Sequence, residues 1–175
     1  MASDGHGSVT VKECIFQAPM DLKTLRLASI ALTKDLLCQF VAYQRTLLAE
    51  LARSTEAEWS GRFAFAHGRA LAGSKLDLVT LGKVKALVSD FCGRRSALLQ
   101  IQEKLAGLDP ADPKSQAVWD RAQKELPRLE SLDELEARYG KDAIALLVSR
   151  EHELVTLHRD LARAEGGEGH LHPPG

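Results

Sequence analysis

The sequence predicts an all-α protein, an antiparallel helical bundle of about four main helices, and three observations support this prediction. Apolar residues recur at alternating steps of three and four in several long segments, which is the spacing of one helix face. Leu and Ala, both strong helix formers, are the two most frequent residues. Alternating β-branched residues, which would indicate half-buried strands, are absent outside the N-terminal segment.

Length and charge narrow the class further. The chain has 175 residues, is 45% hydrophobic and carries a formal net charge of −1. This length fits one domain with its own core, and the charge gives no general attraction to nucleic acid or an anionic membrane. No apolar run approaches the ~18 residues that cross a bilayer, and the N-terminus lacks the features of a secretory signal. We therefore expect a cytoplasmic protein without membrane insertion or nucleic-acid binding, although a signal segment removed by processing would leave no trace.

The first helix is predicted over residues 21–54. Before it, residues 1–17 are expected to form an extended arm, because no other segment reads as a strand that would pair with them. The helix has one continuous apolar face and a second apolar ridge about 100–120° around its axis. An apolar arc this wide packs on several neighbours of the same chain or receives a partner helix. If the arc receives a partner helix, the interaction surface is the ridge formed by Ile30, Leu37, Val41 and Leu48.

Further helices are predicted over residues 56–72, 80–106 and 114–126. Between the last two, residues 107–113 hold two Asp-Pro pairs, which favour a loop that is either a rigid corner or a hinge. The inward face of the 114–126 helix is expected to consist of Val118, Trp119, Ala122 and Leu126. Pro127 is expected to kink or end that helix.

The C-terminal part is predicted as a short helix followed by a long one. Ser131 and Glu134 have the spacing of a capping box, and Gly140 suits the end of the short helix that they open. The last helix is expected over residues 141–164. The Gly-rich segment 166–175 is expected to be a disordered tail, so residues 18–165 form a single helical-bundle domain.

The last predicted helix also carries the candidate polar site. With Leu154 at the centre of its apolar face, Arg150, Glu151 and His158 fall within about 60° of that centre. Charged groups at such positions must pair with one another or with a facing helix. They form either a ligand-binding or metal-binding site, with His67 as a possible fourth group, or an ordinary boundary network.

Other chemistry finds little support in the sequence. The Glu-x-x-His pairs of di-metal bundles are absent, as are the Gly-x-Ser-x-Gly and Gly-rich phosphate-binding motifs. Three isolated cysteines indicate free thiols and no disulfide framework. We therefore expect no catalytic residues, no metal and no cofactor. The basic side formed by Lys83, Lys85, Arg94 and Arg95 is interpreted as a solvated helix face.

The functional expectation follows from these features. We expect a non-enzymatic helical protein that acts through protein–protein contacts, as an adaptor, scaffold or regulatory partner, with a partner protein or a second copy of itself. The alternative is a small-ligand-binding or metal-binding bundle with its polar site around Arg150, Glu151 and His158.

Overall fold

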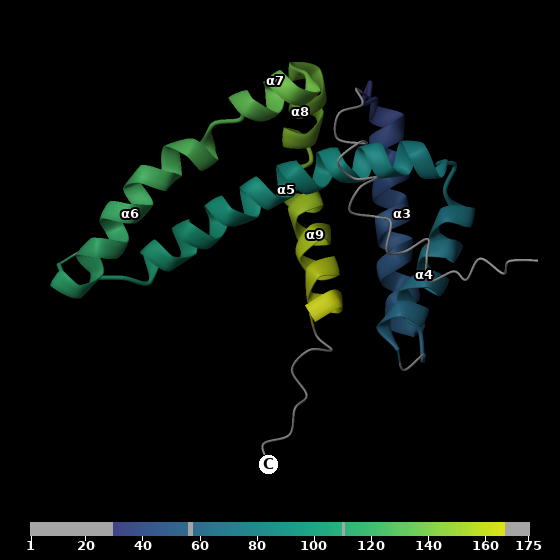
Figure 1. The fold of residues 1–175 in the computed structure, drawn as a ribbon, viewed down its shortest axis with the longest axis horizontal. Helices are drawn as coiled ribbons and strands as arrows, with labels where there is room; N and C mark the ends of the chain where they lie inside the picture. The colour runs from purple at the N-terminus through teal and green to yellow at the C-terminus, as the bar shows by residue number, and fades with distance from the viewer. Residues whose placement is uncertain (1–29, 56–57, 110, 167–175) are drawn as a thin grey trace, which may run out of the picture.

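The computed structural model describes residues 30–55, 58–109 and 111–166, and every regular element within these ranges is an α-helix. The all-α class is therefore confirmed (Figure 1). The predicted arm, residues 1–17, lies outside the described residues, and so does the predicted tail beyond residue 166. The number of helices exceeds the four expected, mainly because the C-terminal region is divided into short elements.

Helix α3 (Lys34–Arg53) begins later than the sequence indicated. Residues 30–33 precede the helix, so the prediction of a continuous helix over 21–54 is wrong there, and residues 21–29 lie outside the described residues. The physical reason is the cap at Thr33. Its backbone is extended, and its Oγ1 accepts a hydrogen bond from the Leu36 amide at 3.1 Å, which ends the helix on the N-terminal side.

Helix α4 (Trp59–Gly73) returns alongside α3 as the second half of a helical hairpin (Figure 1). Its buried face is formed by Ala66 and Ala70, whose small side chains allow the two helices to approach closely. The hairpin places His67 of α4 against Tyr43, near the middle of α3.

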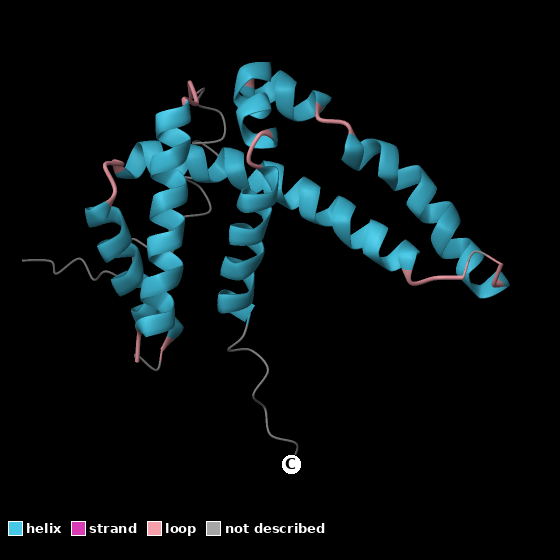
Figure 2. Ribbon diagram, turned by 180° about the vertical axis from the view of Figure 1, so that it is seen from behind, coloured by secondary structure: helices cyan, strands magenta, loops and turns pink. Residues whose placement is uncertain are grey.

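Helix α5 (Leu78–Ala106) is the longest element, with 29 residues, or about 43 Å at 1.5 Å per residue. Asp77 caps it by accepting from the Thr80 amide at 2.9 Å. Its first half packs against α3 and α9. Its second half extends away from the α3–α4 pair, as Figures 1 and 2 show from opposite sides.

Helix α6 (Pro113–Glu130) runs back along the second half of α5 (Figure 2). Asp112 caps it by accepting from the Lys114 amide at 3.0 Å. The sequence predicted that Pro127 kinks or ends this helix, and the second alternative is wrong because α6 continues to Glu130. Pro127 is exposed and lies one turn before the end, and its carbonyl still accepts from the Ser131 amide at 3.1 Å. We call residues 96–130 the α5–α6 hairpin.

The C-terminal region contains α7 (Asp133–Tyr139), α8 (Lys141–Val148) and α9 (Glu151–Gly166). The predicted capping box is absent: Ser131 Oγ accepts from the Asp133 amide at 3.2 Å, and Glu134 pairs with Arg94. Gly140 does end the short helix, as predicted, with a φ of 92° that favours glycine.

The single helix predicted over 141–164 is interrupted at Ser149 and Arg150. The hydroxyl of Ser149 donates to the Leu146 carbonyl at 2.7 Å, and the Arg150 amide donates to the Leu147 carbonyl at 3.1 Å. Such side-chain and short-range bonds compete with the regular helical pattern, so α9 is a separate helix from α8.

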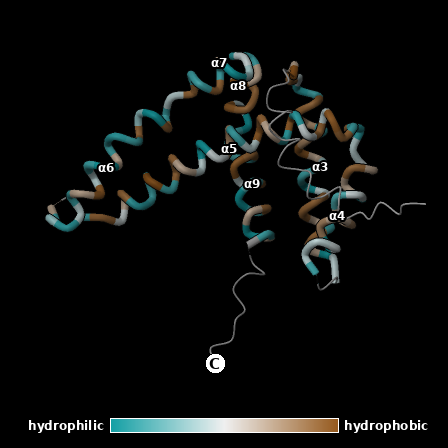
Figure 3. Tube along the Cα trace, in the orientation of Figure 1, coloured by the Kyte–Doolittle hydropathy of each residue, from teal (hydrophilic) through white to brown (hydrophobic). Residues whose placement is uncertain are grey.

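The core collects apolar side chains from α3, α5, α8 and α9. In Figure 3, hydrophobic positions alternate with hydrophilic ones along α5 and α6, as expected for helices with one buried face. The largest fully buried side chains of this core include Phe40, Phe91, Leu87, Ile144, Leu147 and Leu154.

Candidate functional site

A cavity of about 230 Å³ lies between α3, α4, α5 and α9. Its inner wall belongs to α3 and is almost completely buried, whereas Lys85, Ala162 and Glu165 are exposed and mark its mouth. The cavity therefore opens to solvent on the side where α5 and α9 meet. It is lined by Phe40, Tyr43, Gln44, Leu47, Phe63, Lys85, Ser89, His158, Leu161, Ala162 and Glu165.

His67 stands behind this wall. Its Nδ1 lies 2.6 Å from the hydroxyl of Tyr43, and its ring stacks on Phe63 with the ring centroids 5.9 Å apart. Burial raises the pKa of Tyr43 to about 12, while burial and the nearby charge of Lys85 lower the pKa of His67. Tyr43 therefore stays protonated beside a neutral imidazole, and the two groups share one hydrogen bond.

Gln44 carries the polar group of the inner wall. The residue is only 6% exposed, and among the described residues its Oε1 has no hydrogen-bond partner. Buried polar atoms in native structures nearly always have a partner, in the protein or in ordered water. Gln44 is a lining residue of the cavity, but its unpartnered Oε1 is itself covered by neighbouring protein atoms.

His158 contributes a half-buried imidazole from α9. Burial lowers its pKa, although the carboxylate of Glu165 acts in the opposite direction. The ring is therefore neutral at pH 7 and offers one donor and one acceptor. Two of the sequence-predicted site residues, His158 and His67, thus lie at or behind the same cavity.

Arg150 and Glu151 do not join them, because each has other partners. Glu151 accepts two bonds from Arg95, at 2.8 Å from Nε and 2.9 Å from the guanidinium NH2 nitrogen. Arg150 pairs with Glu153 at 2.7 Å and lies 3.3 Å from the Cys38 sulfur. These contacts hold the start of α9 against α5 and α3. They correspond to the ordinary boundary network that was the alternative to a ligand-binding site.

The ridge predicted as an interaction surface lies mostly inside the chain. Leu37 and Val41 are buried in the core, and Ile30 and Leu48 are partly buried against it. The physical reason is that α3 packs against α4, α5 and α9, so its wide apolar arc is covered by neighbours within the chain. These residues therefore belong to the core of the chain itself, which was the alternative interpretation of the wide apolar arc.

The basic side of α5 is also not a free patch. Arg94 pairs with Glu134 at 2.9 Å and donates to the Arg128 carbonyl at 3.0 Å. Arg95 is the partner of Glu151. Two of the four predicted cations are therefore largely buried contacts between helices, which corrects the interpretation of this side as a solvated face.

The sequence reasoning missed a groove on the α5–α6 hairpin, with a volume of about 540 Å³. Val118 was expected to face inward but is 44% exposed at this groove. The apolar spacing of Ile101 and Leu105 on one helix and Val118 and Ala122 on the other was visible in the sequence. The pairing of the two helices was not. The groove is lined by Ile101, Lys104, Leu105, Ala117, Val118, Arg121, Ala122 and Glu125.

Two further findings bear on chemistry. Within the described ranges, no three His, Cys, Asp or Glu side chains are grouped closely enough to hold a metal ion, and no helix there is long and apolar enough to cross a membrane. Cys38 is an exposed free thiol and Cys92 a buried one, whereas Cys14 lies outside the described residues.

Comparison with known proteins gives no relative: no family model, no curated protein sequence and no solved structure matches the chain.

Proposed function

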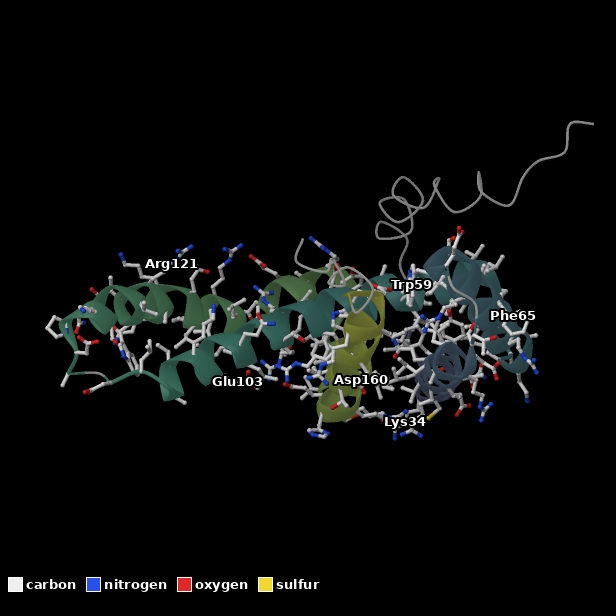
Figure 4. All side chains as sticks on the ribbon, turned by 90° about the horizontal axis from the view of Figure 1, so that it is seen from below. Lys34, Trp59, Phe65, Glu103, Arg121 and Asp160 are labelled. Atoms are coloured by element: carbon white, nitrogen blue, oxygen red, sulfur yellow. The ribbon has the colours of Figure 1, made fainter. Side chains whose placement is uncertain are left out.

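We propose that this protein is a non-enzymatic adaptor that binds a partner protein through the groove of its α5–α6 hairpin. The observation that carries the proposal is the exposed apolar groove on a hairpin that projects from the rest of the molecule (Figure 1). Figure 4 shows Glu103 and Arg121 on this hairpin, at the opposite end of the molecule from Trp59 and Phe65 on α4. The cytoplasmic location expected from the sequence is part of this proposal.

The groove exists because two helices alone cannot cover each other's apolar faces. Leu98, Leu105 and Ala122 are buried between α5 and α6, which holds the hairpin together. Beside them, Val118 and Ala117 remain exposed, and Ile101 is only partly covered. An apolar groove between two helices can bind an amphipathic helix of another protein, which places apolar side chains into the groove at helical spacing.

The charges at the rim indicate which helix fits. Lys104 and Arg121 line the groove, are exposed, and make no ion pair with another described residue. Glu125 lies 3.9 Å from Arg128, so its charge is partly compensated. The rim is therefore net basic, and we propose an amphipathic helix with acidic residues beside its apolar face as the partner.

A pair of designed peptides tests this proposal. Both are about 18 residues long, enough to form a helix on binding, and share one apolar face. One carries Glu at the flanking positions and the other carries Lys. We expect the Glu peptide to bind the full chain at least about tenfold more tightly than the Lys peptide in fluorescence anisotropy titrations, a difference of about 1.4 kcal/mol.

Two matched variants locate the binding. Val118→Asp places a charge in the groove and is expected to weaken binding of the Glu peptide by at least about tenfold. Val148→Asp makes the same change at a residue that is equally exposed, 43% against 44%, but lies on α8. It is expected to bind like the unmodified chain.

Three results would contradict the proposal: no binding of the Glu peptide, equal binding of the two peptides, or equal effects of the two variants. Light scattering of the full chain could give a fourth contradicting result. A dimer that dissociates on Val118→Asp would mean that a second copy of this chain occupies the groove, and the partner-helix proposal would be wrong.

The alternative site around Arg150, Glu151 and His158 is not supported in that form, because Arg150 and Glu151 are bound to Glu153 and Arg95.

A further inference from the structure

The cavity between α3, α4, α5 and α9 is a second candidate site, and it does not depend on the α5–α6 groove. Phe40 and Leu47 give it a buried apolar surface. Two polar side chains from α5 and two from α9 also line it, and none of the four forms a hydrogen bond or an ion pair with another described residue. These four are Lys85, Ser89, His158 and Glu165.

The α5 side of the cavity supplies hydrogen-bond donors. Lys85 and Ser89 are four residues apart and therefore lie on the same face of α5, one above the other. The lysine ammonium has three N–H donors and a positive charge, and the serine hydroxyl adds a further donor. The charge of Lys85 acts on this part of the structure, because it contributes to the lowered pKa of His67. A carboxylate is the group that such a pair binds best.

The α9 side supplies acceptors. His158 and Glu165 are seven residues, or about two turns, apart on α9, so they too share a face. Burial lowers the pKa of His158 more than the charge of Glu165 raises it, and the neutral ring has one acceptor nitrogen. Glu165 adds acceptor oxygens and a negative charge. An ammonium group is the complement of this side.

Size and burial define the rest of the ligand. A cavity of ~150 Å³ lined by apolar side chains is large enough to hold benzene. At about 230 Å³, this one has room for a benzyl or isobutyl group together with the atoms that join it to the mouth. Lys85 and Glu165 are exposed, so the charges of a ligand bound there stay partly hydrated while its apolar group is buried. The cost of burying an ion is thereby avoided.

We propose that this cavity binds a free α-amino acid with a large apolar side chain, such as phenylalanine or leucine. Its carboxylate pairs with Lys85 and Ser89, and its ammonium group pairs with Glu165 and His158. Its side chain lies against Phe40 and Leu47. Because α5 and α9 each bind one of the two charges, the site selects the free amino acid over the end of a peptide, which carries only one of them at that residue.

Four probes separate the terms of this proposal. Phenylalanine has both charges and the ring, phenylalanine amide lacks the carboxylate, N-acetylphenylalanine lacks the ammonium group, and glycine lacks the ring. We expect phenylalanine to cause saturable NMR shifts of the His158 ring and of the backbone amides of Lys85 and Ser89 in the full chain. The other three probes are expected to bind at least about tenfold more weakly.

Variants of the chain test each charge separately. Lys85→Gln is expected to weaken phenylalanine binding at least about fivefold and to cause no loss for phenylalanine amide, which has no carboxylate. Glu165→Gln is expected to weaken phenylalanine binding to the same extent and to cause no loss for N-acetylphenylalanine. Lys83→Gln is the matched control, because Lys83 is on the same helix but does not line the cavity, and it is expected to leave phenylalanine binding unchanged.

The proposal is wrong if phenylalanine causes no saturable shift, or if glycine binds as tightly as phenylalanine. Equal binding of phenylalanine amide or N-acetylphenylalanine would mean that the site takes one end of a peptide, which also overturns it. So would shifts that map away from α5 and α9, or equal effects of Lys85→Gln and Lys83→Gln. Lys85 and Glu165 are exposed, so their substitution is expected to leave the helical content unchanged in circular dichroism. If one variant fails to fold, the other variant and the order of the four probes decide the question.

Discussion

The pair between Arg95 and Glu151 distinguishes a structural from a ligand-binding role for Glu151. The two side chains are 19% and 26% exposed, and they form two bonds of 2.8 and 2.9 Å between α5 and α9. Glu151→Gln keeps the size of the side chain but leaves the guanidinium without its carboxylate. Breaking a fully buried pair costs about 3–5 kcal/mol, and exposed pairs contribute about 0–1 kcal/mol. For this partly exposed pair we expect a loss of about 2 kcal/mol.

Thermal unfolding followed by circular dichroism measures this loss. For a chain of this size, 1 kcal/mol corresponds to about 2–4 °C in Tm, so we expect a decrease of about 4–8 °C. Glu134→Gln is the matched control: its bond to Arg94 is also short, at 2.9 Å, but Glu134 is 72% exposed. We expect that variant to lose less than about 1 kcal/mol. If the two substitutions lower Tm equally, burial does not determine the contribution of the Glu151 pair, and the reasoning is refuted.

Two other predictions concern pH and the backbone. Because burial lowers the pKa of His67 and His158, the unfolded state binds more protons as pH falls below about 6.5, and the free energy of unfolding should decrease from pH 7 to pH 5. Urea unfolding at several pH values should show this decrease, and a smaller one in His158→Gln; an unchanged slope would contradict the assignment. Gly140→Ala should destabilise the chain by about 1–3 kcal/mol because its φ is 92°. Gly68→Ala, in a helix with open space around it, should stabilise the chain by about 1 kcal/mol, and equal effects of the two substitutions would argue against backbone strain at Gly140.

Periodicity predicted much of the helical content but not all of the boundaries. The apolar repeat continues through Thr33, so the sequence showed no reason to begin α3 there. The hydroxyl that caps the helix acts through one local hydrogen bond that leaves no trace in the hydrophobic pattern. Likewise, Ser149 interrupts the last helix without a Gly or Pro to mark the break. Gly140 and the loop at 107–113 were predictable because glycine and proline restrict the backbone directly.

The candidate sites depended on tertiary contacts that the sequence does not contain. His158 was identified from its position on an apolar helix face, and it does line the cavity. Gln44 was missed, because nothing in the sequence distinguishes a glutamine with a partner from one without. The assignment of Leu37 and Val41 to an interaction surface failed since it required knowing that α4, α5 and α9 cover α3.

The central claim, that the α5–α6 hairpin receives an acidic amphipathic helix, is tested most directly by NMR mapping. The isotope-labelled full chain is titrated with the unlabelled Glu peptide, and amide and methyl shifts are followed. The account predicts saturable shifts concentrated at Ile101, Leu105 and Val118, which line the groove. Shifts concentrated on α3 and α4, or no saturable shift anywhere, would contradict it.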